Sequence, residues 1–436
     1  MTKHIVVIGG GMAGTAAAHQ LATHGYKVTI LEQNSYLGGR IRTQFMDGEA
    51  VEMGAGFMSS FYTNMRAFLK EEGLLNQLYK QNKSTGILRN GRVSMATLRT
   101  LSGQGALSHK AKLQMVPLVF ATLLRWRKLN IHAFWKAHAY DTTTAADMFA
   151  SSAAKKELLE YFWQPVCNGY FYWEPERVSR AMVLTLTKAF LKNRGTYKLR
   201  GGLCQIPKRA AKNATVLLGH SVKEVTWANG VYSIRIDQGG KSKKIQADGI
   251  VCATTATAVP RIFADLTLRQ RSFFAAVQYS TTALVARTYP RGQSPRDIGI
   301  AFPRQEKTEL AAVTVEPKGD VAAVNIYASG VAGKKLGRLS DAQLIARLDE
   351  NAAAVNAAIL PANAKPLHTH TQRWAEALPF FDIGHYKRLY AFERGEVEDP
   401  TQPLVFAGDY LGGPLMEGAF TSGLQAAERL HQRLSP

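Results

Sequence analysis

The sequence predicts a protein of the α/β class, built on a parallel sheet and joined to a second domain of the α+β class. The chain opens with a short apolar run, a glycine-rich turn and an alanine-rich stretch, in the order strand, turn, helix. Glycine-rich segments recur near residue 201 and near residue 412. With 436 residues, of which 46% are hydrophobic and 20% charged, the chain is long enough for two folded domains.

The opening stretch HIVVIGGGMAGTAAAHQLATHGYKVTILEQ is interpreted as a strand–helix–strand unit. We expect a buried strand over residues 5–8, a helix over 13–24 and a second buried strand over 28–31. Each strand is a short apolar run, and the alanine-rich stretch between them is long enough for a helix. A helical connection of this kind joins parallel strands.

The turn between this strand and helix follows the pattern G-x-G-x-x-G over Gly9, Gly11 and Gly14. The first glycine allows a tight turn, the second lets the backbone approach a pyrophosphate, and the third lets the helix pack closely on the strand. The first amides of the helix, those of Met12 and Ala13, would face the phosphates. The turn is therefore predicted to hold a dinucleotide.

An acidic residue ends the second strand. Glu32 follows Gly14 by 18 residues, where a carboxylate can accept hydrogen bonds from ribose hydroxyls. A basic residue is expected there in a pocket for NADP, so Glu32 argues against that cofactor. The whole unit is thus predicted to be a Rossmann-like dinucleotide site.

The segments beyond the acid carry a family resemblance. YLGGRIRT and VEMGAGFMSS resemble the segments that follow the dinucleotide fold in the flavin-containing amine oxidase superfamily, which includes protoporphyrinogen oxidases and phytoene-desaturase-like enzymes. In that family the arginine of the GGR segment lies at the FAD pyrophosphate. The resemblance implies that Gly39, Arg40 and Arg42 bind the cofactor, together with Gly54 and Gly56. Arginine suits this position because its forked donors match phosphate oxygens.

The resemblance returns in two later segments. ATVLLGHSVKEVTWANGVYSIRI resembles the family's second FAD-binding hairpin, where a backbone valine holds the adenine, and Val222 is the matching residue. LVFAGDYLGGPLMEGAFTSGLQAAERL resembles its terminal FAD motif. There Gly408 and Asp409 would lie at the ribityl chain, and Gly418 and Ala419 would begin a helix directed at the isoalloxazine. A helix N-terminus at that place stabilises the anionic reduced flavin.

FAD is thus the predicted cofactor, and the predicted domains are discontinuous. The Rossmann-like FAD-binding domain is expected over residues 1–75, 195–262 and 395–436, and the α+β substrate-binding domain over 76–194 and 263–394. The terminal motif contains no cysteine, so the cysteinyl-flavin link of some amine oxidases cannot form there and a noncovalent FAD is expected. The cysteines and histidines show no metal-ligand spacing, and no metal site is predicted.

The resemblance implies an oxidoreductase in which the substrate gives a hydride to flavin N5. The favoured interpretation is a protoporphyrinogen-oxidase-like or desaturase-like enzyme that dehydrogenates a bulky apolar or partly anionic small molecule, with dioxygen or a quinone as electron acceptor. A flavin amine or amino-acid oxidase that makes peroxide is the second interpretation. Flavin amine oxidases usually carry a lysine near N5, and the comparable stretch VQYSTTALVARTYP has none. The third is a catalytically inactive binding protein of the same fold.

The family motifs identify fewer residues in the substrate-binding domain than in the FAD-binding domain. YFWQPVCNGYFYW holds seven aromatic residues, Tyr172 among them, which form either the wall of an apolar pocket or ordinary helix core. QRWAEALPFFDIGHYKRLY resembles the family's tryptophan-to-proline segment, which approaches the flavin. Trp374 and Pro379 are therefore pocket candidates. His385 is either an acid or base, or a hydrogen-bonded structural histidine.

The net charge of +21 indicates an anionic partner. Residues 73–140 contain eleven Lys and Arg and no Asp or Glu. No nucleic-acid-binding motif accompanies this charge, so a nucleic acid is not expected. Three widely spaced cysteines fit a reducing interior, and the predicted location is the cytoplasm, with peripheral membrane contact through this basic segment.

The centre of the basic segment is apolar over residues 113–124 and flanked by basic residues and a tryptophan. It is too short to span a bilayer, but it suits an element that dips into a membrane interface. The alternative is a buried helix of the substrate domain. Under the first interpretation, changing Leu118, Phe120 and Trp126 to polar residues releases the protein from lipid vesicles.

Overall fold

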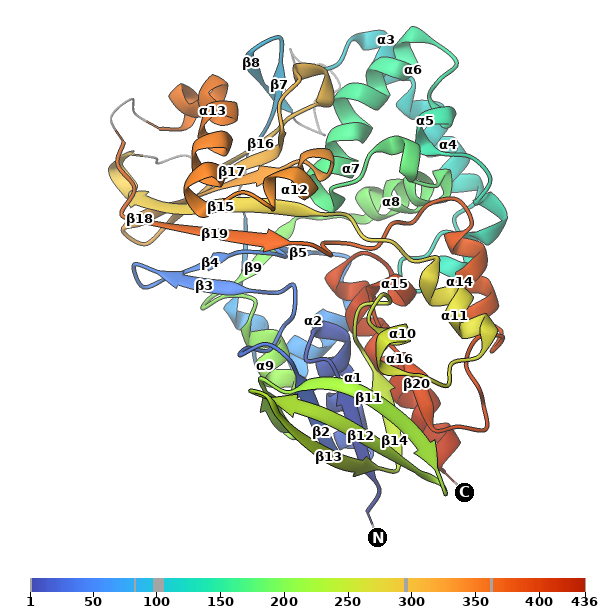
Figure 1. Cartoon of the computed structure of the whole chain (residues 1–436). Helices are drawn as coiled ribbons and strands as arrows, with labels where there is room; N and C mark the ends of the chain where they lie inside the picture. Colours follow the sequence, from blue (N-terminus) through green and yellow to red (C-terminus); the bar gives the residue numbers. More distant parts are fainter. Residues whose placement is uncertain (1, 82–83, 97–105, 294–296, 361–363, 436) are drawn as a thin grey trace.

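The computed structural model describes residues 2–81, 84–96, 106–293, 297–360 and 364–435. In Figure 1 a parallel sheet lies near the two chain ends at the bottom, a larger mixed sheet lies above it, and a group of helices stands beside the larger sheet. The predicted α/β class, with a Rossmann-like part and an α+β part, is confirmed.

Strands from distant parts of the chain form the parallel sheet. Their order is β10 (Thr215–Leu218), β2 (Lys27–Glu32), β1 (His4–Ile8), β14 (Gly249–Cys252) and β20 (Leu404–Phe406). Helix α1 (Met12–Thr23) connects β1 to β2, and Ile5 pairs with Val28 in parallel register. The predicted strand–helix–strand unit is thus confirmed, with ends within one residue of those expected.

The two faces of this sheet are covered differently. Ile5 and Val7 of β1 pack with α1 and α16 (Met416–Leu434), whereas Val6 and Ile8 pack with a three-stranded antiparallel sheet. That small sheet is formed by β11 (Ser221–Ala228), β12 (Val231–Gln238) and β13 (Lys241–Ala247). Alternate side chains of one strand therefore serve two cores, as expected for a strand buried on both faces.

The larger sheet has seven strands and is antiparallel except where β16 runs parallel to β7. In order, they are β19 (His368–Trp374), β15 (Thr282–Pro290), β18 (Val321–Ala328), β17 (Leu310–Lys318), β16 (Ile298–Ala301), β7 (Ser84–Arg89) and β8 (Arg92–Ala96). Helices α12 (Gly330–Leu336) and α13 (Asp341–Ile359) pack on it.

Short strands connect the two large sheets. The hairpin β3 (Thr43–Met46) and β4 (Glu49–Glu52) packs through Met46 and Val51 against Leu284 and Ala286 of the seven-stranded sheet. A further small sheet has the order β5 (Met58–Ser59), β9 (Thr196–Leu199) and β6 (Leu78–Lys80). Because β3 and β4 follow the predicted cofactor loop directly, this arrangement brings that loop under the larger sheet.

The helical layer has an aromatic-rich core, in which Trp163 and Trp173 are fully buried. Its helices are α3 (His109–Leu113), α4 (Met115–Leu124), α5 (Ala145–Met148), α6 (Ala153–Leu158), α7 (Gln164–Phe171), α8 (Arg180–Lys192) and α14 (His385–Glu393). The remaining helices are α2 (Thr63–Glu71), α9 (Gln205–Ala210), α10 (Val259–Ile262), α11 (Leu268–Ala275) and α15 (Asp409–Gly412).

The apolar segment over residues 113–124 has two faces. Leu118 is only 3% exposed and packs into the helical core, so its inclusion in the vesicle-release test was wrong. Phe120 is 61% exposed and Leu124 is 68% exposed. Among the described residues, no helix is long and apolar enough to cross a membrane. Residues 82–83 and 97–105 of the basic segment lie outside the described residues.

Candidate active site

The turn after β1 has two glycines that no other residue can replace without a clash. Gly9 has a φ of +102°, and a Cβ added there would lie 2.7 Å from the carbonyl oxygen of Ala253. A Cβ on Gly14 would lie 1.9 Å from the carbonyl oxygen of Gly9. The turn, the start of α1 and the end of β14 are therefore held in close contact.

The middle glycine of the motif faces open space. A Cβ on Gly11 would meet no heavy atom within 4 Å. Gly11 is the N-cap of α1, and within the described residues no side chain caps this helix. The first amides of α1, at Met12 and Ala13, are thus left for a ligand or solvent, as in an anion site at a helix N-terminus.

Glu32 lies beside this turn and is only 5% exposed. Its Oε2 accepts from the amide of Gly10 at 2.7 Å. Its Oε1 accepts from the amide and the side chain of Asn34 at 2.8 and 2.6 Å. Each carboxylate oxygen has two lone pairs, so Oε2 can accept one more hydrogen bond, which suits a ribose hydroxyl. Asn34, which sequence analysis did not identify, orients this carboxylate.

Arg40 and Asp409 form a bidentate ion pair at the centre of the candidate site. Nη1 donates to Oδ2 at 2.7 Å and Nη2 donates to Oδ1 at 3.0 Å. Nη1 also donates to the carbonyl of Ala377 at 2.9 Å. Burial alone would lower the pKa of Arg40, but Asp409, with smaller contributions from Tyr279 and Glu376, raises it above its ordinary value. The guanidinium stays charged and keeps its Nε–H and one Nη2–H for another acceptor.

Arg42 is engaged elsewhere. Its Nη1 donates to Oε1 of Gln372 at 2.6 Å, and its guanidinium carbon lies 5.1 Å from the centre of the Tyr36 ring. The structure therefore brings Arg40, but not Arg42, to Asp409. Sequence analysis treated the two arginines as equivalent, because spacing along a loop does not reveal where each side chain points.

The glycines near these arginines differ in what surrounds them. Gly39 has a φ of +57°, and a Cβ there would lie 3.3 Å from the Cα of Gly11. A Cβ on Gly54 would lie 2.0 Å from the carbonyl oxygen of Arg40. A Cβ on Gly56 would meet no heavy atom within 4 Å, so open space lies there as well.

The C-terminal motif forms the opposite side of the site. Gly408 donates its amide to Ser422 Oγ at 3.1 Å, next to the buried Asp409. Helix α16 begins at Met416, two residues before the expected start, so Gly418 and Ala419 lie in its first turn. A Cβ on Gly418 would lie 2.4 Å from the carbonyl oxygen of Gly413. Within the described residues no side chain caps α16.

Val222 lies on β11, at a point where the register with β12 shifts. The chain reaches it from β10, and just before β11 the amide of His220 donates to the carbonyl of Glu32, at the end of β2, at 2.8 Å. Val222 is thus two residues beyond a direct contact with Glu32. Val222, predicted to hold the adenine, and Glu32, predicted to hold the ribose, are therefore close together.

Tyr279 was missed by sequence analysis. Its hydroxyl accepts from the amide of Ala256 at 3.0 Å, and its ring centre lies 5.7 Å from the guanidinium carbon of Arg40. Burial raises the pKa of Tyr279 and Asp409 adds to this, while Arg40 opposes it. The hydroxyl therefore remains protonated. The sequence did contain a signal for this part of the site. The hydroxyl-rich segment ATTAT, which includes Ala256, directly follows β14, and ligands of α/β sheets bind beyond the carboxyl ends of strands.

The tryptophan-to-proline segment reaches the same region. Trp374 Nε1 donates to the carbonyl of Met53 at 2.8 Å, and its ring lies 3.4 Å from a Cβ built on Gly54. Pro379 is buried and pairs with Tyr279 in an isolated β-bridge. Both candidates therefore contact residues next to the predicted cofactor loop.

The aromatic stretch divides between core and surface. Trp163, Phe171 and Trp173 are buried in the helical layer. Tyr170 is 49% exposed, and its ring packs edge-on against Phe57 at 5.8 Å. Tyr172 ends α7 with a φ of 58°, and burial followed by the nearby Tyr327 raises its pKa.

His385 has the geometry of a structural histidine. It is fully buried, and Nε2 lies 2.9 Å from the carbonyl oxygen of Tyr410. Arg388 donates to Nδ1 at 3.3 Å, which leaves Nε2 as the protonated nitrogen. Burial, aided by the Arg388 charge, lowers the pKa of His385 to about 3. Because the ring is neutral and both nitrogens already have hydrogen-bond partners, His385 is suited to stabilising α15 and not to transferring a proton.

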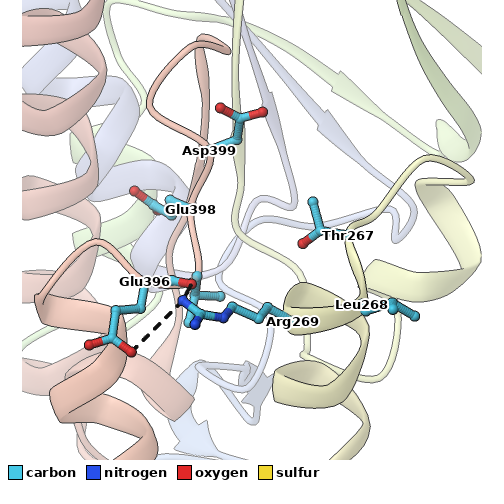
Figure 2. Close-up of a pocket in the computed structure, with 7 residues that line it drawn as sticks. Thr267, Leu268, Arg269, Glu396, Glu398 and Asp399 are labelled. Carbon is cyan, nitrogen blue, oxygen red and sulfur yellow. Dashed lines mark hydrogen bonds and ion pairs between the residues drawn. The ribbon is translucent and has the colours of Figure 1, made fainter.

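A hollow of about 410 Å³ lies outside this region, between the start of α11 and residues 396–399 (Figure 2). Arg269 and Glu396 form an ion pair of 3.9 Å there. Glu398 instead binds Arg429 and Arg433. The lining of this hollow contains none of the predicted cofactor residues.

The arrangement around Gly11 fits an FAD. Two helices, α1 and α16, present uncapped N-termini within the described residues, and open space lies at Gly11 and Gly56. Arg40 retains donors for phosphate and Glu32 retains an acceptor for ribose. These are the groups that a dinucleotide with an anionic pyrophosphate needs.

Comparison with known proteins gives the same cofactor class. A family model described as flavin containing amine oxidoreductase matches residues 12–431. The chain is 25% identical over 289 residues to a probable zeta-carotene desaturase of Synechococcus elongatus, and this match spans 60% of each protein. It is 20% identical over 493 residues to protoporphyrinogen oxidase 2 of Arabidopsis thaliana, covering 98% of this chain and 93% of the relative.

Solved structures share the fold. A triple mutant of putrescine oxidase has a TM-score of 0.81 and 18% identity, with 99% of both chains covered. Cyclohexylamine oxidase from Brevibacterium oxydans has a TM-score of 0.78 and 19% identity over the full length of both chains. At these identities the likeness shows the fold alone.

Proposed function

The chain belongs to the flavin-containing amine oxidoreductase family, and from that premise we propose that it dehydrogenates a bulky apolar or partly anionic small molecule. It is an FAD-dependent oxidoreductase. Relatives named for a carotene and for protoporphyrinogen support a large substrate with carbon–carbon or carbon–nitrogen bonds to oxidise. The reaction would be protoporphyrinogen-oxidase-like or desaturase-like.

The observation that carries this proposal is an aromatic contact next to Gly56 in the sequence. Phe57 follows Gly56 and packs against the half-exposed Tyr170. Paired aromatic rings of this kind suit an apolar substrate. β15 also contains no lysine in its sequence.

Bound FAD supplies a hydride acceptor, and the chain supplies position and electrostatics. The Arg40–Asp409 pair ties the loop after β2 to the end of β20. With FAD bound, the uncapped start of α16 would supply a partial positive charge to stabilise negative charge on the reduced flavin. Tyr279 keeps its hydroxyl hydrogen, because burial and the Asp409 carboxylate raise its pKa, and its oxygen accepts from the amide of Ala256. We assign no general base.

We further propose that the FAD is held without a covalent bond. The three cysteines, Cys167, Cys204 and Cys252, are all buried and free. Burial raises the pKa of Cys252 to about 11 and also raises that of Cys167, which makes both thiols poor nucleophiles. Heat denaturation should therefore release all the flavin into the supernatant as FAD, whereas flavin retained in the protein pellet contradicts a noncovalent site.

The substrate class is tested by anaerobic mixing of the purified flavoprotein with porphyrinogens, isoprenoid chains, cyclic ketones or acids, and amines. Bleaching of the flavin by a porphyrinogen or an isoprenoid supports the proposal, and readmitting dioxygen or a quinone then identifies the electron acceptor. Bleaching by amines alone, with peroxide formed on reoxidation, replaces it with an amine oxidase. A protein bleached by none of these compounds that binds lipid in a salt-sensitive manner is instead a binding protein of this fold.

We also propose that α4 contacts a membrane surface peripherally. Val116, Phe120 and Leu124 are each more than 60% exposed and recur every four residues along α4. Arg127 and Lys128, just beyond the helix, are exposed as well. An exposed apolar face next to cations suits the interface of an anionic bilayer. Cosedimentation with phosphatidylglycerol vesicles, weakened by salt and absent with phosphatidylcholine, is expected; no cosedimentation with either contradicts the proposal.

A further inference from the structure

A second cavity, of about 290 Å³, lies within the helical part of the molecule. It is open to solvent on one side and is bordered by the C-terminal half of α8, the loop that follows α4 and the residues at the start of α2. Phe61, Leu129, Ile131 and Ala189 form the apolar part of its walls, and Thr63, Asn130 and Thr185 add uncharged polar groups. None of the residues that line it belongs to the predicted cofactor set.

The polar side chains that line this cavity include three basic groups and no carboxylate. They are Lys188, Lys192 and His132. Lys188 Nζ donates to the carbonyls of Trp126 and Leu129, each at 2.6 Å. An ammonium group has three hydrogens, so one remains for a ligand. Within the described residues neither lysine forms an ion pair, and burial together with Lys192 lowers the pKa of Lys188.

The carboxylate that contacts His132 is held by other groups as well. Glu417 is fully buried and accepts from His132 Nε2 at 2.7 Å. It also accepts from the amides of Asn64 and Met65 at the start of α2, at 2.7 and 3.0 Å. Glu417 therefore stabilises α2 and His132 and leaves the two lysines without a counter-ion. A cavity with this charge favours an anion.

The two lysines that line the cavity also lie beside Trp126, which follows the exposed apolar face of α4. Trp126 follows α4, and its ring lies 4.7 Å from Lys188 Nζ and 5.8 Å from Lys192 Nζ. On the outer side of α4, Leu123 is 53% exposed and Leu124 is 68% exposed. An apolar chain that leaves the cavity past Trp126 would therefore remain on apolar side chains rather than enter water.

We propose that this cavity binds the anionic head of an amphiphile, a carboxylate or phosphate that carries an apolar chain. The two lysines hold the head, and the apolar walls hold its first carbons. At about 30 Å³ for each small group, the volume accommodates about ten groups, too few for a nucleotide or a porphyrin. The inference does not depend on the substrate proposed for the flavin.

Binding is tested by titration calorimetry on the FAD-loaded protein with decanoate and decyl phosphate below their micelle concentrations. Decanol and inorganic phosphate serve as probes of each half of the ligand. Lys192→Gln removes one charge at an exposed position, and Lys334→Gln on α12 makes the same change far along the chain. Ala189→Leu fills the cavity without changing charge, and a thermal melt checks that each variant is folded.

We expect decanoate and decyl phosphate to bind, with affinity at least fivefold lower in Lys192→Gln and Ala189→Leu and unchanged in Lys334→Gln. Decanol and phosphate should each bind at least tenfold more weakly than the amphiphile. Equal decanoate binding in wild type and Lys192→Gln overturns the proposal. Binding to phosphatidylglycerol vesicles without binding of monomers also overturns it, because the surface of α4 then suffices. The flavin spectrum should be the same in all variants, which separates this test from that of the flavin site.

Discussion

At the scale of single residues, two arginine–aspartate pairs of similar geometry lie in different surroundings. Arg40 and Asp409 join two predicted cofactor loops, whereas Arg287 and Asp349 join β15 to α13 with bonds of 2.6 and 2.7 Å. Removing one partner of a buried ion pair costs about 3–5 kcal/mol. Asp409→Asn should lower the free energy of unfolding by about 3 kcal/mol, because Arg40 is partly exposed. It should also weaken FAD binding about tenfold, because Arg40 is no longer held in place.

The matched control is Asp349→Asn, which breaks a bidentate pair far from the candidate site. It should lower stability in urea unfolding but leave the FAD dissociation constant, measured by flavin fluorescence, unchanged. If both variants weaken FAD binding equally, the effect is one of general stability and Arg40 has no specific role in holding the cofactor.

His385 makes a prediction about acid stability. Its pKa is lowered to about 3 in the folded protein, so the unfolded chain binds more protons below pH ~6.5. Stability from this residue is fully present above pH ~6.5 and is lost as the pH falls, by up to about 1.4 kcal/mol per pH unit. His385→Gln, which can still donate to the Tyr410 carbonyl, should remove this slope between about pH 6.5 and 4.5. Wild-type and variant urea midpoints that fall in parallel over this range would contradict it.

At the scale of one element, helix α4 separates packing from surface contact. Leu118→Ala should cost about 2–5 kcal/mol of stability, because Leu118 packs into the helical core, and should leave vesicle binding intact. Phe120→Ser should change stability by less than about 0.5 kcal/mol and reduce vesicle binding, because its ring is exposed. Urea unfolding and cosedimentation measure the two effects. If Leu118→Ala lost vesicle binding and Phe120→Ser kept it, the exposed face of α4 would not be the face that contacts the membrane.

Across the whole molecule, local backbone requirements could be predicted from the sequence and side-chain partners could not. The positions of Gly9 and Gly14 follow from the turn itself, so their spacing was informative. Arg40 and Asp409 are 369 positions apart in the sequence. The family resemblance identified each of them as a cofactor residue, but it did not predict that they form an ion pair. Tyr279 reaches the site through an isolated bridge with Pro379, which has no local pattern. The two faces of α4 became distinct only once its packing on the helical layer was known.

The interleaved topology makes a final prediction about cooperativity. The strands of the parallel sheet come from stretches near residues 5, 30, 215, 250 and 405, and the segments that build the larger sheet lie between them. The predicted FAD contacts lie over residues 9–56, at 222 and over 408–419, so FAD should stabilise both sheets together. At a free FAD concentration of about 100 times the dissociation constant, the gain is about 2.7 kcal/mol, which should raise the midpoint of a single thermal transition by a few degrees. FMN lacks the adenylate half that Glu32 and Val222 would hold, so its effect should be smaller. Calorimetry that resolves two transitions, of which only one shifts with FAD, would show instead that the two sheets unfold independently.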